Sequence, residues 1–235
     1  GGDPAEVVFT SGGTESDNFA LRGAAEALEP LGRKHVIVSA IEHEAILQTA
    51  KALARRGWRV TLLPVDADGL VAPDTLTAAL AEDTALVSIM HANNEIGTVQ
   101  PIRELCAIAH AHKALFHTDA VQSAGKIPMD ARTLGVDLLS ISAHKFYGPK
   151  GVGALWIKRG TRLASAMTGG RQERNRRAGT ENVPAITGLQ VAADLALAKM
   201  ETESSRLAAL RDRLETRILG SVEGTARNGP ADGRV

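Results

Sequence analysis

Hydrophobic and polar positions along the chain follow two alternating periods. Short runs rich in Val, Ile, Leu and Phe, typical of buried strands, occupy residues 6–11, 35–40, 58–65, 84–92, 114–120, 136–145 and 152–159. Between them, apolar residues recur every three or four positions, which predicts helices at 15–32, 44–57, 73–83 and 101–113, and from Val183 to about Gly220. Two of these patterns end at Gly32 and Gly57, and glycine is a typical helix stop signal.

Strands that alternate with helices predict an α/β fold, with a mostly parallel sheet and helices on both of its faces. The last two expected strands are joined only by the sequence "FYGPKG". Because a helical crossover needs a dozen or more residues, we expect these two strands to pair antiparallel. The predicted sheet is therefore mostly parallel with one antiparallel strand.

Composition narrows the class of protein. The chain has 235 residues, and its 27 basic and 27 acidic residues leave no net charge, which argues against binding to nucleic acid. No uninterrupted apolar run reaches the ~18–20 residues of a membrane span, and the first residues do not resemble a signal peptide. The single cysteine excludes an internal disulfide. We therefore expect a cytoplasmic protein with no membrane partner.

Glycine or polar residues follow five of the expected strands, at the edge where ligands bind in open α/β sheets. They are Gly12, Gly13 and Thr14; Glu42 and His43; Asn93 and Asn94; Asp119 and Gln122; and Ser142, His144 and Lys145. This edge of the sheet is the predicted site.

The sequence "TSGGTES" combines a strand end, a glycine turn and a helix start. Backbone N–H groups in such a turn, together with the helix dipole, favour an anion. Thr14 and Ser16 would add hydroxyl donors, although a capped helix after a tight turn explains the same residues. No Gly-Lys-Ser/Thr follows, so this is not a Walker loop, and "GPKGVG" opens a strand and fails as a dinucleotide fingerprint.

Three further residues each allow two interpretations. Asp119 can be a helix cap or the partner of a cationic ring nitrogen, and His43 can be a polar residue at a helix start or a ring that stacks on a planar ligand. Lys145 can be a surface lysine or, if desolvated, an amine nucleophile. An anion site, a carboxylate, a stacking ring and a lysine are together what pyridoxal phosphate requires.

Six segments resemble a known family. They are "FTSGGTESDN", "EHEAIL", "MHANNEIGTVQPI", "HTDAVQSAGKIP", "SAHKFYGPKGVGAL" and "RRAGTENV", spread over nearly the whole chain. They closely resemble the cysteine desulfurases, class V aminotransferase-like enzymes with the aspartate aminotransferase fold. "NNEIG" with "SAHKFYGPKG" is similar to the branch that serves iron–sulfur cluster assembly and tRNA thiolation. The resemblance implies bound pyridoxal 5'-phosphate, L-cysteine as substrate, and a homodimer that passes sulfur to an acceptor or scaffold protein.

The resemblance also implies roles for individual residues. Lys145 would hold the cofactor as a Schiff base, Asp119 would pair with the pyridinium, and Gln122 would bind the phenolic oxygen. His43 would stack on the ring and handle protons, and Asn94 would contact the cofactor or the substrate carboxylate. The phosphate would be held by Gly13, Thr14, Ser142 and His144, and by Thr180 of the neighbouring subunit.

The family's catalytic cysteine has no counterpart here. It belongs to a mobile loop of the C-terminal domain, so we expect residues 1–200 to form the cofactor-binding large domain and 201–235 to begin an incomplete small domain, with an N-terminal segment also missing. Cys106 lies among Ile102, Leu105 and Ile108 on a helix face that should be packed, so we assign it a structural role. The substrate-binding arginine cannot be assigned.

Other functions remain open. The alternatives are another class V enzyme, such as a selenocysteine lyase or a small-amino-acid aminotransferase, and a non-catalytic scaffold with the same fold. A metal site at His110, His112 and His117 is disfavoured, because residues two apart on a helix face different ways and zinc needs three or four converging ligands. No metal is expected.

Overall fold

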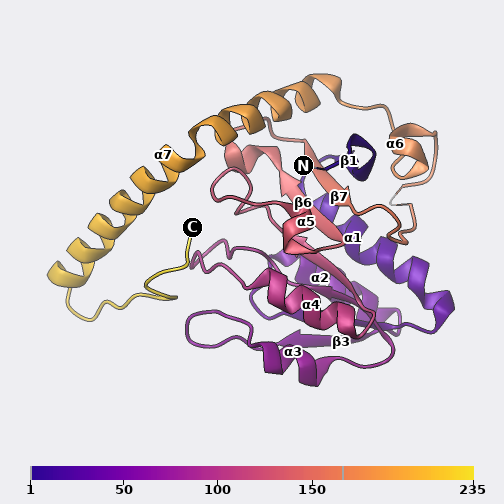
Figure 1. Ribbon diagram of the computed structural model, residues 1–235, viewed down its shortest axis with the longest axis horizontal. Coiled ribbons are helices and arrows are strands. Elements are labelled where there is room, and N and C mark those ends of the chain that lie inside the picture. Colours follow the sequence, from indigo (N-terminus) through magenta and orange to yellow (C-terminus); the bar gives the residue numbers. More distant parts are fainter. Residues whose placement is uncertain (1, 166) are drawn as a thin grey trace.

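A seven-stranded sheet forms the centre of the computed structural model, which describes residues 2–165 and 167–235 (Figure 1). The strands stand in the order β1-β7-β6-β5-β4-β2-β3. Their bounds are β1 Val7–Thr10, β2 His35–Ser39, β3 Arg59–Leu63, β4 Thr84–Ser88, β5 Leu115–Asp119, β6 Leu138–Ser142 and β7 Gly153–Ile157. The expected strands are confirmed, each somewhat shorter than its apolar run.

Only β7 runs against the direction of the other described strands. It pairs antiparallel with β6 on one side, with Ser142 opposite Gly153, and antiparallel with β1 on the other. The remaining neighbours pair parallel. The expected antiparallel strand is thereby confirmed, and the carboxyl ends of β1, β6, β5, β4 and β2 all lie at one edge.

Helices cover both faces of the sheet. On one face, Phe19 of α1 (Gly13–Leu28) and Ile46 of α2 (Glu44–Arg55) share a core with Val36 and Leu86. On the other face, α3 (Pro73–Ala79) and α4 (Ile102–Ala111) pack their apolar sides on Ile37 and Phe116. Short helices α5 (Ala131–Leu134) and α6 (Gln172–Asn175) complete the connections and were not expected from the sequence.

Helix α7 (Val183–Ser221) confirms the long helical pattern and extends past the sheet (Figure 1). Only Ala185, Leu189 and Ala192 are buried, in a small core beneath its first turns that includes Phe146. The helix crosses residue 200 without a break, and the division into domains at that residue stays a prediction. By length and composition alone, α7 is long and apolar enough to span a membrane, but core helices of soluble proteins meet the same criterion.

The backbone approaches itself closely at Gly153. A Cβ atom there would lie 2.6 Å from the Ile141 carbonyl oxygen and 2.8 Å from backbone atoms of Gly12. Backbone atoms cannot swing aside as a flexible side chain can, so only glycine fits where β7 passes the β1–α1 turn.

We therefore expect Gly153→Ala to destabilise the fold by about 1–3 kcal/mol, the usual range for overpacking. Gly220→Ala is the matched control, because a Cβ atom there meets nothing within 4 Å. In a helix this change should stabilise by up to about 1 kcal/mol. Urea unfolding of the three proteins measures both effects, and equal stability of the two variants would contradict the packing described here.

Candidate active site

The ends of three strands meet around the β1–α1 turn. A Cβ atom on Gly13 would lie 2.9 Å from Cγ2 of Val121, which follows β5, and 3.5 Å from Cβ of Ser142, which ends β6. The parallel strands thus bring segments more than a hundred residues apart in sequence to one place. Gly13 and Ser142, both predicted site residues, lie side by side.

The N-terminus of α1 is open to an anion. Its N-cap residue is Gly12, at φ 151°, and no side chain among the described residues caps the helix. Thr14 is exposed in the first turn of the helix. Beside this turn, the Ser142 hydroxyl lies 2.9 Å from Nδ1 of His144. Free N–H groups, the helix dipole and nearby hydroxyl and imidazole donors favour phosphate at this position.

Asp119 supplies a buried carboxyl group at the end of β5. Its Oδ1 accepts a hydrogen bond from the Val121 backbone N–H at 2.8 Å. Burial raises the pKa of Asp119 above its usual value, and the hydrogen bond from Val121 and the side chains of His43 and Lys145 offset only part of this rise. Two predicted catalytic residues therefore lie within electrostatic reach of the predicted partner of the ring nitrogen.

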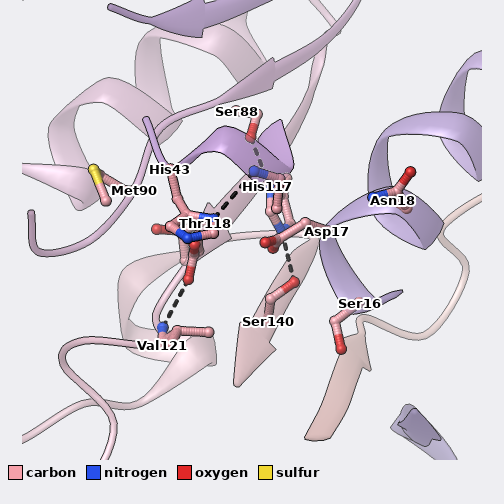
Figure 2. A network of polar contacts seen from close by, with 12 residues as sticks. Ser16, Asp17, Asn18, His43, Ser88, Met90, His117, Thr118, Val121 and Ser140 are labelled. Carbon is pink, nitrogen blue, oxygen red and sulfur yellow. Dashed lines mark hydrogen bonds and ion pairs between the residues drawn. The ribbon is translucent and has the colours of Figure 1, made fainter. Parts of the chain in front are cut away.

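A second buried carboxyl group, Asp17, lies in a polar network with His117 (Figure 2). His117 bridges two hydroxyl groups there, with Nδ1 2.8 Å from Ser88 Oγ and Nε2 2.9 Å from Ser140 Oγ. Burial lowers the pKa of His117 to about 3. Burial, and next the charge of Asp119, raise the pKa of Asp17 well above its usual range. Both shifts disfavour the charged forms, which weakens the 3.7 Å contact between Asp17 and His117 as an ion pair.

Lys145 does not end a strand. Strand β6 stops at Ser142, and Ala143–Phe146 form a 3₁₀ turn that carries His144 and Lys145. Both side chains are exposed, so the desolvation of Lys145 considered from the sequence is not found. An apolar run predicts a strand but not where it ends, and the turn sets Lys145 at the mouth of the site.

A second lysine, Lys126, lies near Lys145 and was missed as a site residue. Burial, and then the positive charge of Lys145, lower its pKa. Its Nζ donates to Oε1 of Gln122 at 2.8 Å, which places Gln122 at the same edge. No sequence pattern singles out Lys126, because it lies in an irregular connection after β5.

His43 is the N-cap residue of α2. Its Nδ1 accepts a hydrogen bond from the Ala45 backbone N–H at 3.1 Å. This bond occupies the Nδ1 lone pair and so assigns the ring proton of the neutral imidazole to Nε2. Because the residue is exposed, the ring can stack on a planar ligand and exchange a proton through Nε2.

The structure places the remaining two predicted residues at the surface. Asn94 is exposed, whereas its neighbour Asn93 is buried and donates to the Ile41 carbonyl oxygen at 3.0 Å. Thr180 is also exposed, in the connection from α6 to α7. Arg177 of that connection pairs with Glu15 in the first turn of α1 at 2.7 Å, which holds the connection near the anion site.

Comparison with known proteins matches the sequence of this chain to one family. The class-V aminotransferase family profile matches residues 1–234. The chain belongs to the class-V aminotransferase family.

Among sequence relatives in this class-V family, the chain is 53% identical to cysteine desulfurase IscS of Dictyoglomus turgidum over 98% of its own length and 58% of that protein. It is 54% identical to cysteine desulfurase IscS of Methanosarcina thermophila, covering 91% of this chain and 53% of that one. The chain therefore spans a little more than half the length of these relatives.

Solved structures of class-V proteins are similar too. A NifS-like protein superposes with a TM-score of 0.90 at 42% identity, over 93% of this chain and 60% of that chain. DndA from Streptomyces lividans gives 0.88 at 40% identity, over 99% and 66%. The expected fold of a pyridoxal-phosphate enzyme's large domain is confirmed.

Class-V aminotransferases use pyridoxal phosphate, and the residues of this chain fit that cofactor. An uncapped helix N-terminus suits the phosphate, and the buried carboxyl group of Asp119 suits a ring nitrogen that carries a proton. Lys145 is an exposed amine on the neighbouring turn. The group would supply an electron sink for bonds at the substrate α-carbon.

We expect Lys145 to carry the cofactor covalently. Borohydride reduction of the loaded chain, followed by peptide mass mapping, should place the label on Lys145, and Lys145→Ala should abolish it. Lys126 and Lys150 lie close by in space or sequence and provide internal controls. A label on either of them would disprove the assignment to Lys145.

Proposed function

We propose that this chain is the cofactor-binding part of a cysteine desulfurase. The chain is 53% and 54% identical to two relatives with that name. The function is also supported by the open helix N-terminus at the sheet edge that carries Asp119, His43 and Lys145. The reaction converts L-cysteine to L-alanine and moves the sulfur atom to a cysteine thiol. The C–S bond breaks, an S–S bond forms, and the acceptor thiol becomes a persulfide, so the atoms balance without an added oxidant.

The cofactor phosphate would be bound by the N–H groups of Gly13 and Thr14 and by Ser142 and His144. Burial, and then the charges of Lys145 and Lys150, lower the pKa of His144, which favours a neutral ring that can donate one hydrogen bond. Together with the helix dipole, these neutral donors hold the phosphate dianion without a Walker-type lysine.

Proton transfer would fall to His43 and Lys145. In the proposed arrangement Asp119 keeps the ring nitrogen protonated by charge pairing, and Gln122 orients the ring through its phenolic oxygen. Lys145 would hold the cofactor and, as a free amine, would take the α-proton. His43 stacks on the ring and exchanges a proton through Nε2, and Asn94 contacts the substrate carboxylate or the cofactor.

Cys106 does not serve as the sulfur acceptor in this proposal. It is 1% exposed on α4, and burial, followed by the charge of Asp137, raises the pKa of its thiol to about 12. A nucleophilic cysteine needs access and a thiolate. Since Cys106 is the only cysteine in these 235 residues, the acceptor thiol has to come from outside them.

The wider setting is also proposed from the relatives. A cytoplasmic homodimer would pass sulfur to an acceptor or scaffold protein for iron–sulfur cluster assembly or tRNA thiolation. Another class V activity, such as a selenocysteine lyase or a small-amino-acid aminotransferase, is the second candidate. A non-catalytic scaffold is the third, and a purified protein without the yellow colour of bound cofactor would favour it.

The proposed function is tested by exchange of the substrate α-proton. The loaded chain should exchange the α-proton of L-cysteine in deuterated water, followed by proton NMR. Asp119→Asn should slow exchange at least about tenfold, because each pKa unit of lost charge pairing corresponds to that factor. Asp194→Asn, an exposed carboxyl group on α7, is the control and should exchange at the normal rate.

The same incubation separates the alternatives. A desulfurase chain with a buried Cys106 should form no persulfide on that residue, measured as protein-bound sulfane sulfur. Formation of a keto acid with loss of the yellow colour would instead identify an aminotransferase. Absence of exchange in a loaded, folded chain would refute the desulfurase proposal.

Thr180 leads to a prediction about assembly. Its side chain has no hydrogen-bonding partner among the described residues, and we propose that it binds the phosphate in the neighbouring subunit of a symmetric dimer. Sedimentation over a concentration series should show dimers, and Thr180→Val should weaken cofactor binding without dissociating them. A monomer that binds the cofactor as tightly would contradict this role.

A further inference from the structure

Glu42 is a buried acid with an unusual environment. It is 5% exposed and lies in the turn between β2 and α2, directly before His43. Glutamate is almost never this buried unless a cation pairs with it. No such cation is found for Glu42 among residues 2–165 and 167–235.

The two oxygens of Glu42 differ sharply. Oε1 accepts hydrogen bonds from the Ser39 hydroxyl at 2.5 Å and from the Met90 backbone N–H at 2.8 Å. Oε2 is shielded from water and has no hydrogen-bond partner among the described residues. A buried ionised carboxylate with a bare oxygen is far more costly than a neutral acid, in which the bare oxygen carries the proton.

These two bonds tie the turn to the sheet. Ser39 ends β2, and Met90 follows the end of β4, so Glu42 joins two neighbouring strand ends. Asn93 adds a second tie from the same side, through its bond to the Ile41 carbonyl oxygen. The backbone that leads into His43 is therefore fixed at two successive residues, Ile41 and Glu42.

Charge near the site gives the second argument. Asp119 lies close enough for its charge to raise the pKa of Glu42. The charges of Asp119 and Glu42 in turn raise the pKa of Asp17. The basic side chains at this edge, His43 and Lys145, act on Asp119. A second buried negative charge would compete with Asp119 for them.

We propose that Glu42 is a positioning residue that works as an uncharged carboxylic acid, fixing the His43 turn to the end of β4 without adding negative charge beside Asp119. Its link to catalysis rests on the proposed function of His43. Its protonation and its hold on the turn can both be measured in the cofactor-free chain, so failure of this inference and failure of the desulfurase proposal are distinguishable.

Infrared difference spectroscopy tests the protonation directly. At neutral pH the cofactor-free chain should show the carbonyl stretch of a protonated carboxylic acid that Glu42→Gln removes. Asp17→Asn is the companion variant and should remove a separate band while leaving that of Glu42. If Glu42→Gln removes only a carboxylate band, Glu42 is ionised and the inference is wrong.

Stability against pH gives an independent test. Burial raises the pKa of Glu42 from about 4.5 to about 8, so between these values the folded chain holds a proton that the unfolded chain has lost. The stabilisation from this group is complete below pH 4.5 and falls as pH rises to 8. The unfolding constant of the wild type relative to Glu42→Gln should increase by up to about tenfold per pH unit over this range. A ratio that does not change with pH would overturn the proposal.

NMR of the histidine rings tests the positioning. Glu42→Gln keeps a carbonyl acceptor for Ser39 and Met90 and should leave the ring shifts of His43 unchanged, whereas Glu42→Ala should move them. His112, at the end of α4, is the internal control and should not respond in either variant. His43 shifts that are the same in the alanine variant, in a chain that still folds, would show that Glu42 does not position this turn.

Discussion

The burial of a carboxyl group at the end of β5 is the constraint on which the site depends. Asp119 is buried, so its charged form can be stabilised only by the backbone N–H of Val121 and by the neighbouring side chains of His43 and Lys145. Two more carboxyl groups, Asp17 and Glu42, are buried around it. Three buried negative charges in so small a volume would repel each other, and the neutral imidazole of His117 offers no compensation. Burial raises the pKa of all three carboxyl groups, so the arrangement favours at most one charged group among them.

This constraint explains why the site is built at the convergence of parallel strands. Only there do backbone N–H groups from a helix start and from several turns point toward the same space. The antiparallel strand β7 joins β1 to the rest of the sheet, and its tight passage at Gly153 holds the β1–α1 turn in place. A rigid turn at the proposed phosphate site and an exposed Lys145 both suit the proposed cofactor-binding function.

The single cysteine belongs to a different part of the molecule. Cys106 lies 3.7 Å from His110 Nε2, which is 2.7 Å from Asp137 Oδ2. In a nucleophilic triad the two ring nitrogens of the histidine face different partners, whereas here Nε2 lies toward both the thiol and the carboxylate. The thiol is also buried, and its pKa is raised. The set packs α4 against the start of β6, and in the proposed desulfurase Cys106 is not the sulfur acceptor.

The sequence by itself determined the alternation of strands and helices, the antiparallel pair and the polar strand ends. Local periodicity encodes these features, and a six-residue connection cannot form a crossover. It also assigned Cys106 a packed position, because apolar neighbours surround it on the helix. Only the tertiary structure decided that β6 ends before Lys145, that Lys126 joins the site, and that Asp17 and Glu42 lie beside Asp119. Burial and charge coupling arise between residues far apart in the chain, and no local pattern records which of them meet.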